Sequence, residues 1–184
     1  MNYKDIFELL LDEEDYTVGG GSSSAIAGAI ACGLIGMVAN LSKGKDYGYS
    51  DEKYNNLIKE LNKMKEKLLQ GCVDDNKAYL LIVNAYKLPK NNEKEKLKRI
   101  NAIQKAGIEA AKVPMENACL NKRVYDIGQI LLKHSNPACE TDLQAGIDLS
   151  AMGIRAGKAN VEVNLPLIRD EKIIRDFKKK METL

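Results

Sequence analysis

One acidic residue, Asp75, stands where the pattern of its predicted helix favours an apolar side chain. The helix carries an apolar stripe at heptad-like spacing that leads to this residue, through Leu57, Leu61, Met64, Leu68 and Gly71. A carboxylate on such a face is unfavourable unless it is paired or hydrogen-bonded. Asp75 is therefore either a structural residue bonded to a neighbouring helix or to buried water, or a general acid or base whose pKa is set by its surroundings.

A second carboxylate, Asp142, begins a face of small residues on a later predicted helix. The face continues through Gly146, Leu149, Gly153, Ala156 and Asn160, and small residues at this spacing allow another helix to approach closely. An aspartate in the first turn of a helix also stabilises the helix dipole. Asp142 is therefore either a functional carboxylate or a favourable N-terminal charge.

The segment Gly19–Ser24 places glycines and serines directly before an apolar helix. Free backbone N–H groups gather at such a point and can bind an anion or a carbonyl oxygen, here at Gly20, Gly21 and Ser22. The segment is not a P-loop, because no Gly-Lys-Ser/Thr follows it. It could equally be a flexible entry into a crowded helix.

The elements that must position these residues are almost all helical. Helix-favouring residues dominate the chain, while two phenylalanines, four prolines and no tryptophan leave little material for a β-sandwich. Helices are predicted at 3–14, 25–41, 51–87, 93–134, 142–158 and 171–180, with a kink or new start at Pro114 and an extended segment at 160–164. The 184 residues therefore predict one all-α domain over 1–184, a bundle of about six long helices.

The helix predicted at 25–41 is the most apolar part of the chain. Almost every residue in it is apolar or glycine, and its length approaches the roughly 20 residues that cross a bilayer. The run is slightly short, rich in alanine and glycine, and the only one of its kind. These features favour a central helix buried on all sides over a membrane span.

The charge balance and the cysteine pattern argue against several kinds of function. Lysine and arginine number 28 and aspartate and glutamate 26, so charge gives no support for nucleic-acid binding. Four cysteines without a Cys-x-x-Cys pair and a single histidine, His134, predict buried free thiols and no metal site. The N-terminus has no signal-peptide pattern, and we expect a cytoplasmic protein.

Six motifs, taken in order, resemble the cyclodeaminase/cyclohydrolase family. They are Gly-Gly-Gly-Ser at 19–22, Met-Val-Ala-Asn-Leu at 37–41, Gly-Lys at 44–45, Asp-Asn-Lys-Ala-Tyr at 75–79, Asn-Pro-Ala-Cys-Glu-Thr-Asp-Leu-Gln at 136–144 and Asn-Val-Glu-Val-Asn-Leu at 160–165. No single motif is specific, but the ordered set is. The chain is similar to this family over about residues 17–170.

That resemblance implies an all-helical homodimer that acts on one-carbon adducts of tetrahydrofolate without a metal or other cofactor. Three functions remain open. The first is hydrolysis of methenyltetrahydrofolate to 10-formyltetrahydrofolate, favoured because no formiminotransferase half accompanies the chain. The second is a formiminotetrahydrofolate cyclodeaminase that releases ammonia. The third is a non-catalytic folate-binding bundle, suggested by departures from the family pattern such as Val18 in place of the usual proline.

The resemblance also implies roles for particular residues. Asp75 would take a proton from the attacking water and return it, with Asp142 as its partner or as a hydrogen-bonding group for the pterin. Lys43 and Lys45 could meet the glutamate carboxylates of folate, although cations also suit the C-terminal end of a helix. The other substrate-binding candidates are Gly20, Gly21, Ser22, Asn40, Asn136, Asn160 and Asn164, of which the last three could equally cap turns and loops.

Overall fold

The computed structural model describes all 184 residues and contains six α-helices and no β-strand. The helices are α1 (Tyr3–Leu10), α2 (Gly20–Leu41), α3 (Asp51–Tyr86), α4 (Glu93–Leu131), α5 (Glu140–Asn164) and α6 (Glu171–Glu182). Two short 3₁₀ turns, η1 (Pro137–Cys139) and η2 (Leu165–Leu167), precede and follow α5. The predicted all-α fold is confirmed, with four long helices and two short ones.

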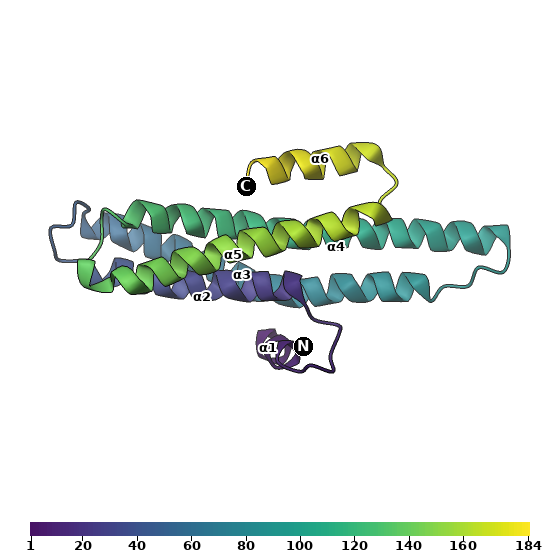
Figure 1. Cartoon of the computed structure of the whole chain (residues 1–184), viewed down its shortest axis with the longest axis horizontal. Coiled ribbons are helices and arrows are strands. Elements are labelled where there is room, and N and C mark those ends of the chain that lie inside the picture. Colours follow the sequence, from purple (N-terminus) through teal and green to yellow (C-terminus); the bar gives the residue numbers. More distant parts are fainter.

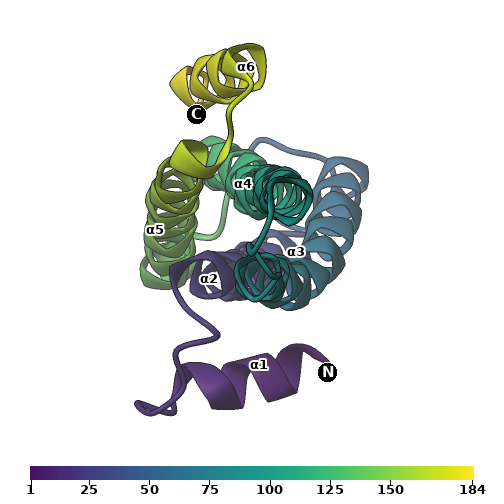
Figure 2. The same cartoon turned by 90° about the vertical axis from the view of Figure 1, so that its right-hand side faces the viewer.

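Helices α2, α3, α4 and α5 form a four-helix bundle in which each helix packs against its two neighbours, and α2 also contacts α4 across the bundle. Figure 2 looks along the bundle and shows α1 outside it beside α2, and α6 outside it on the opposite side. A cluster of 22 buried side chains fills the bundle, and a second cluster of six lies beneath α6. The four long helices therefore carry the core, and the short helices cover two of its outer faces.

Side-chain caps begin most of the helices. Ser50, Asn92 and Asp170 accept hydrogen bonds from backbone N–H groups in the first turns of α3, α4 and α6. Helix α2 is different, because its N-cap is Gly19, which has no side chain to accept such a bond. The first N–H groups of α2 therefore need an acceptor from another part of the chain.

Helix α2 differs in two ways from the helix predicted at 25–41. It begins at Gly20, so the glycines and Ser22 that were expected in a loop form its first turn. It is also not buried on all sides, because Ile30, Met37 and Leu41 are 48%, 40% and 49% exposed. Its length and composition would suit a membrane span, yet 56% of its most apolar window is buried inside the bundle. Packing against α3, α4 and α5 accounts for its apolar inner face, while the apolar side chains of its outer face remain partly exposed.

Helices α3 and α4 continue as a two-helix hairpin beyond the ends of α2 and α5 (Figure 1). The predicted stripe of α3 is buried as far as the bundle extends, at Leu57, Leu61, Met64 and Leu68. Tyr86 lies on the same stripe but is 48% exposed, because the hairpin has no further helix to cover it there.

Helix α4 runs without interruption through Pro114, so the predicted new start at this residue is wrong. Proline has no N–H to give the carbonyl one turn earlier, that of Ala110. In this fold the side chain of Asn164 donates to that carbonyl, with Nδ2 and O 3.0 Å apart. The extended segment predicted at 160–164 is also wrong, because it forms the last turns of α5, where Asn160 and Asn164 both donate to carbonyls one turn back.

A buried asparagine joins three helices at the centre of the bundle. Asn121 of α4 is fully buried and donates through Nδ2 to the carbonyl of Ser24 on α2, at 3.1 Å. Glycines on both sides make room for it, since a Cβ on Gly28 of α2 or Gly153 of α5 would collide with its side chain. Its Oδ1 accepts no hydrogen bond and lies against both glycines. The small-residue faces of α2 and α5 thus admit a polar side chain as well as a neighbouring helix.

The four cysteines are free thiols, as predicted. Cys32, Cys72 and Cys139 are buried, and Cys119 is half-buried. Burial raises the pKa of Cys32 to about 12 and that of Cys72 to about 11. These two thiols therefore stay protonated at neutral pH and act as small apolar side chains.

Candidate active site

Asp75 lies in the C-terminal half of α3 and faces the first turn of α2. Its Oδ2 accepts a hydrogen bond of 2.9 Å from the Ser22 hydroxyl. Because Gly19 gives α2 no side-chain cap, Asp75 provides from another helix the negative charge that favours a helix N-terminus. The close approach of the Asp75 carboxyl to α2 requires a glycine at position 21, because a Cβ on Gly21 would lie 2.6 Å from Asp75 Cγ. The helix start that was expected to bind an anion of a ligand is therefore occupied by the protein's own carboxylate.

The pKa of Asp75 is raised above the ordinary aspartate value. Burial of the carboxyl group is the main cause, because it disfavours the charged form. The hydroxyl and the backbone N–H of Ser22 favour the charged form and lower the pKa, but by less. A raised pKa lies closer to neutral pH than that of an ordinary aspartate. It therefore suits a carboxyl that both accepts and returns a proton at neutral pH.

Asp75 opens into a pocket of about 370 Å³ between the start of α2, the C-terminal half of α3 and the end of α5. Thirteen residues line this pocket, and Asp75 is the only charged side chain among them. Gly20, Gly21, Asn160 and Asn164 also line it, whereas Ser22 is fully buried behind it. Six of the predicted site residues therefore meet here, in a space within the usual size range of small-molecule sites.

The two asparagines of the pocket use their amide nitrogens within the chain. Asn160 Nδ2 donates to the Ala156 carbonyl at 2.9 Å, and Asn164 Nδ2 donates to the carbonyls of Ala110 and Asn160 at 3.0 and 2.8 Å. A Cβ on Gly20 would lie 2.7 Å from Asn160 Nδ2, so this glycine lets the asparagine approach α2. The two Oδ1 atoms accept no hydrogen bond from the chain, and each can accept one from a ligand N–H.

Two tyrosines of the pocket, Tyr16 and Tyr79, were not among the predicted site residues. Tyr79 lies four residues after Asp75, and this helical spacing is a signal that places both side chains on one face. Tyr16 is 82% exposed and lies in the irregular segment between α1 and α2, where no periodicity indicates a direction. Asn76 of α3 holds that segment in place by donating to the carbonyl of Thr17 at 2.9 Å.

The other five predicted site residues lie at the opposite end of the bundle (Figure 1): Asn40, Lys43, Lys45, Asn136 and Asp142. With a rise of about 1.5 Å per residue, the length of α2 separates this end from Asp75 by about 30 Å. The fold of the chain therefore does not bring Asp142 and Asp75 together. Asn136 has a structural role there, since its Oδ1 caps η1 by accepting from the Ala138 N–H at 3.0 Å.

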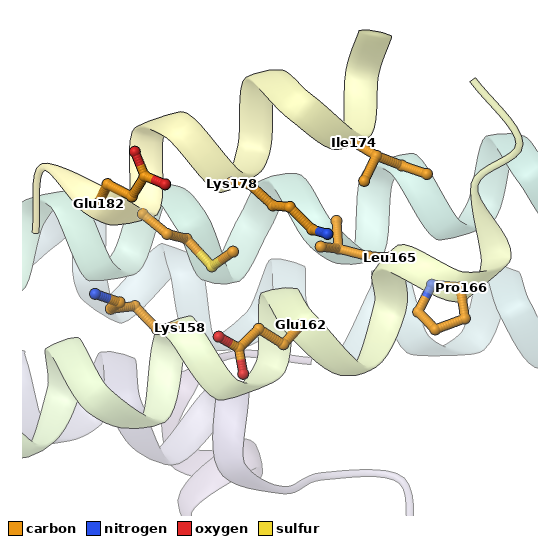
Figure 3. A pocket seen from close by; sticks show the side chains of 8 residues that line it. Lys158, Glu162, Leu165, Pro166, Ile174, Lys178 and Glu182 are labelled. Carbon is orange, nitrogen blue, oxygen red and sulfur yellow. The ribbon is translucent and has the colours of Figure 1, made fainter. Parts of the chain in front are cut away.

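A larger pocket than the one at Asp75 lies between α5 and α6 (Figure 3). It has a volume of about 650 Å³, and its charged lining consists of Lys158, Glu162, Lys178 and Glu182. These charges are of both signs, and none of the four side chains is buried. No three histidine, cysteine, aspartate or glutamate side chains converge anywhere in the chain. The pocket at Asp75 combines a half-buried carboxyl with free acceptors and is the better candidate for chemistry.

Comparison with known proteins identifies one family and relatives with two enzyme names. Residues 5–183 match the family model described as formiminotransferase-cyclodeaminase. A methenyltetrahydrofolate cyclohydrolase of Methylorubrum extorquens is 31% identical over 175 residues, which cover 91% of this chain and 81% of the relative. The formimidoyltransferase-cyclodeaminase of Gallus gallus is 32% identical over 155 residues, but the chain spans only 29% of that protein's length.

A solved structure has the same fold over the whole chain. The formiminotetrahydrofolate cyclodeaminase of Thermotoga maritima superposes with a TM-score of 0.83 at 26% identity, covering 100% of this chain and 87% of the other. The topology and the relative positions of the helices around Asp75 are therefore shared with a protein of known structure.

Proposed function

This chain belongs to the formiminotransferase-cyclodeaminase family, and we propose that it hydrolyses methenyltetrahydrofolate to 10-formyltetrahydrofolate. The main support is the position of Asp75, a half-buried carboxyl that is the only charged side chain of its pocket. The substrate carries a cationic amidinium carbon, which a carboxylate in a poorly solvated pocket attracts and stabilises. The similarity to a cyclohydrolase over most of both chains supports the same reaction.

In the proposed mechanism Asp75 is first a base and then an acid. Its carboxylate takes a proton from a water molecule while the water oxygen bonds to the amidinium carbon. The resulting tetrahedral adduct then loses one carbon–nitrogen bond, and Asp75 returns its proton to the departing nitrogen. The remaining hydroxyl becomes the formyl carbonyl and releases its proton to solvent, so one water is consumed and one proton is released. Oδ1 is the oxygen we assign to these transfers, because the Ser22 hydroxyl holds Oδ2.

The other pocket residues would bind and orient the substrate. We propose that the free Oδ1 atoms of Asn160 and Asn164 accept hydrogen bonds from N–H groups of the pterin. The Tyr79 ring would cover one face of the substrate's aromatic system. Neither role requires a metal or an organic cofactor, and we propose none for this reaction.

A formiminotetrahydrofolate cyclodeaminase is the second candidate function. The observation that favours it is the match to a cyclodeaminase structure over 100% of this chain. In that reaction a folate N–H nitrogen attacks the formimino carbon. The proton of that nitrogen and the proton held by Asp75 both pass to the formimino nitrogen, whose bond to carbon breaks as it leaves as ammonia. The same pocket would serve both reactions, and the substrate decides between them.

We also propose that the protein is a homodimer joined through the exposed face of α2. The face carries Ile30, Met37 and Leu41 and continues onto Phe7 of α1, which is 47% exposed. A groove of about 460 Å³ with mainly apolar lining lies between α1, α2 and α3. A two-fold axis crossing α2 near its middle, at Gly33, would bury the face against itself with the two α2 helices antiparallel. Each protomer's Lys43 and Lys45 would then approach the partner's pocket.

Absorbance spectroscopy tests the proposed reaction. Methenyltetrahydrofolate has a chromophore that hydrolysis destroys, so the purified chain should speed its loss above the buffer rate. Asp75→Asn should keep the fold and lower turnover roughly a hundredfold or more, while Asp74→Asn, on the exposed side of the same turn, should stay near wild type. Appearance of the chromophore from formiminotetrahydrofolate would instead identify a cyclodeaminase, and tight folate binding without turnover would identify a binding protein.

A further inference from the structure

The Ser22 hydroxyl lies between two acceptors that both belong to α3. Its Oγ is 2.9 Å from Asp75 Oδ2 and 3.0 Å from the carbonyl oxygen of Cys72. A hydroxyl has a single proton and can donate to only one of these acceptors at a time. Ser22 is fully buried and does not line the pocket, so it has no contact with substrate and no water to donate to instead.

The two acceptors differ in one respect, which is that only the carboxylate changes charge. While Asp75 is ionised, its oxygen is the stronger acceptor, because hydrogen bonds to charged groups are stronger than those to neutral ones. Once Asp75 takes up a proton, that advantage is lost and the Cys72 carbonyl becomes an equivalent partner. The hydroxyl is satisfied in both states, which matters because an unsatisfied buried donor is costly.

We propose that Ser22 is a positioning residue whose hydroxyl follows the charge of Asp75, donating to Oδ2 in the ionised state and turning to the Cys72 carbonyl in the protonated state. This proposal rests on the proposed function of Asp75 as base and acid. In the first state the hydrogen bond stabilises the carboxylate and leaves Oδ1 for proton transfer. In the second state the hydroxyl stays satisfied, and as the proton passes to the departing nitrogen it turns back to Oδ2 and stabilises the carboxylate that forms.

The surroundings of Asp75 leave Ser22 as the main group that can favour its charged form. On α3, Asp74 points away and is held by Gln70 and Lys77 at the surface, and Cys72 stays protonated. The only other titratable groups of the pocket are Tyr79 of α3 and Tyr16 of the segment between α1 and α2. Helices α2, α4 and α5 contribute only glycine, aliphatic and amide side chains to it.

Titration of Asp75 in the intact chain tests the proposal without any folate. Carbon-13 NMR of aspartate-labelled protein reports the ionisation of each carboxyl, and Asp75→Asn assigns the signal. Ser22→Ala should raise the pKa of Asp75 further, because it removes a hydrogen bond that favours the charged form. The matched control is Ser24→Ala, since Ser24 is equally buried on the same helix but its hydroxyl donates to the Gly21 carbonyl. The control should leave the Asp75 titration unchanged.

Two further variants keep the test decisive if Ser22→Ala folds poorly. Ser22→Thr retains the hydroxyl and should keep the titration near wild type, whereas Ser22→Cys supplies a weak donor and should raise the pKa partway. An Asp75 titration that does not respond to loss of the hydroxyl, or that responds equally in Ser24→Ala, would overturn the proposal.

The catalytic consequence is measured separately in a pH–rate profile. The rate should fall on the acid side as Asp75 becomes protonated, and in Ser22→Ala this acid limb should move to higher pH. At neutral pH kcat should drop roughly tenfold with little change in KM, because Ser22 does not touch the substrate. If the wild-type chain does not turn over methenyltetrahydrofolate, the proposed function fails while the NMR titration still tests Ser22. If the titration shifts and the acid limb does not, the catalytic half of the proposal is wrong.

Discussion

Asn164 occupies the hydrogen-bonding position that Pro114 leaves open in α4. The proline cannot donate to the Ala110 carbonyl, and Asn164 Nδ2 reaches that oxygen at 3.0 Å from the neighbouring helix. Ala110 and Asn164 both line the pocket beside Asp75. The carbonyl that the proline leaves without a donor therefore ties the end of α5 to α4 beside the pocket.

A double-mutant cycle measures this relationship. Asn164→Ala should lower the free energy of unfolding by about 1–3 kcal/mol, because it leaves a buried carbonyl without a donor. In a Pro114→Ala background the loss should be clearly smaller, since the alanine N–H then serves the same carbonyl. Urea denaturation of the wild type, the two single variants and the double variant gives the coupling free energy between Pro114 and Asn164.

Asn160→Ala provides the control for the cycle. Its Nδ2 donates only to a carbonyl of its own helix, that of Ala156, so its effect should be the same with proline or alanine at position 114. Equal losses for Asn164→Ala in the two backgrounds would show that Pro114 and Asn164 are independent.

The features that could be predicted from the sequence are those that depend on the geometry of one helix. The heptad-like spacing places Asp75 on the inner face of α3 because that face is fixed by the 3.6-residue period alone. The same argument could have included Tyr79, one turn later. The caps Ser50 and Asn92 are equally local, because each side chain bonds to an N–H three residues away.

The features that could not be predicted depend on contacts between distant segments. Pro114 indicates a break by any local rule, and only the donor on Asn164, 50 positions later, removes the penalty. The first turn of α2 has no cap of its own, so its start at Gly20 depends on Asp75 of another helix. The family resemblance predicts Asp142 as a partner of Asp75, yet the path of the chain places the two carboxylates at opposite ends of the four-helix bundle.

Asp75 should make the stability of the protein depend on pH in a defined direction. Its pKa is raised in the folded state, so the folded protein binds this proton more tightly than the unfolded chain. Its contribution to stability is therefore complete below the ordinary aspartate pKa of about 4 and is lost as the pH rises through the folded-state pKa. Asp75→Asn, which cannot ionise, should be more stable than wild type at pH 8, and the difference should shrink toward pH 4.

Thermal unfolding at pH 4, 6 and 8 measures this difference. Asp74→Asn is the matched control, because Asp74 lies at the surface and bonds to Gln70 and Lys77, and it should show no gain at pH 8. An Asp75→Asn variant that is less stable than wild type at pH 8 would mean that the ionised carboxylate stabilises the start of α2 by more than its burial costs.

Lys43 and Lys45 should affect the binding of folates with long glutamate tails. Changing both to methionine should raise KM several-fold for a polyglutamylated substrate and have little effect on the monoglutamate. The difference should shrink with added salt, because exposed charges are screened within about 8–10 Å at physiological ionic strength. Lys59→Met with Lys63→Met, two exposed lysines of α3, controls for the loss of positive charge. Equal losses for both substrates would contradict binding of the tail.

The exposed face of α2 should hold two protomers together and complete the site between them. Light scattering should give about twice the chain mass of 20.4 kDa, and Ile30→Glu with Met37→Glu should return the protein toward 20.4 kDa.

A mixing experiment tests whether the site is shared between two chains. The Asp75→Asn variant is mixed with the double variant Lys43→Met, Lys45→Met, and activity is assayed at a low concentration of the polyglutamylated substrate. In a hybrid dimer one pocket has an intact Asp75 and receives intact lysines from the partner. The mixture should therefore be more active than the mean of its two parent proteins. Activity equal to that mean would place every catalytic and binding group of a site in one protomer, and a wild-type mass near 20.4 kDa would rule out the dimer itself.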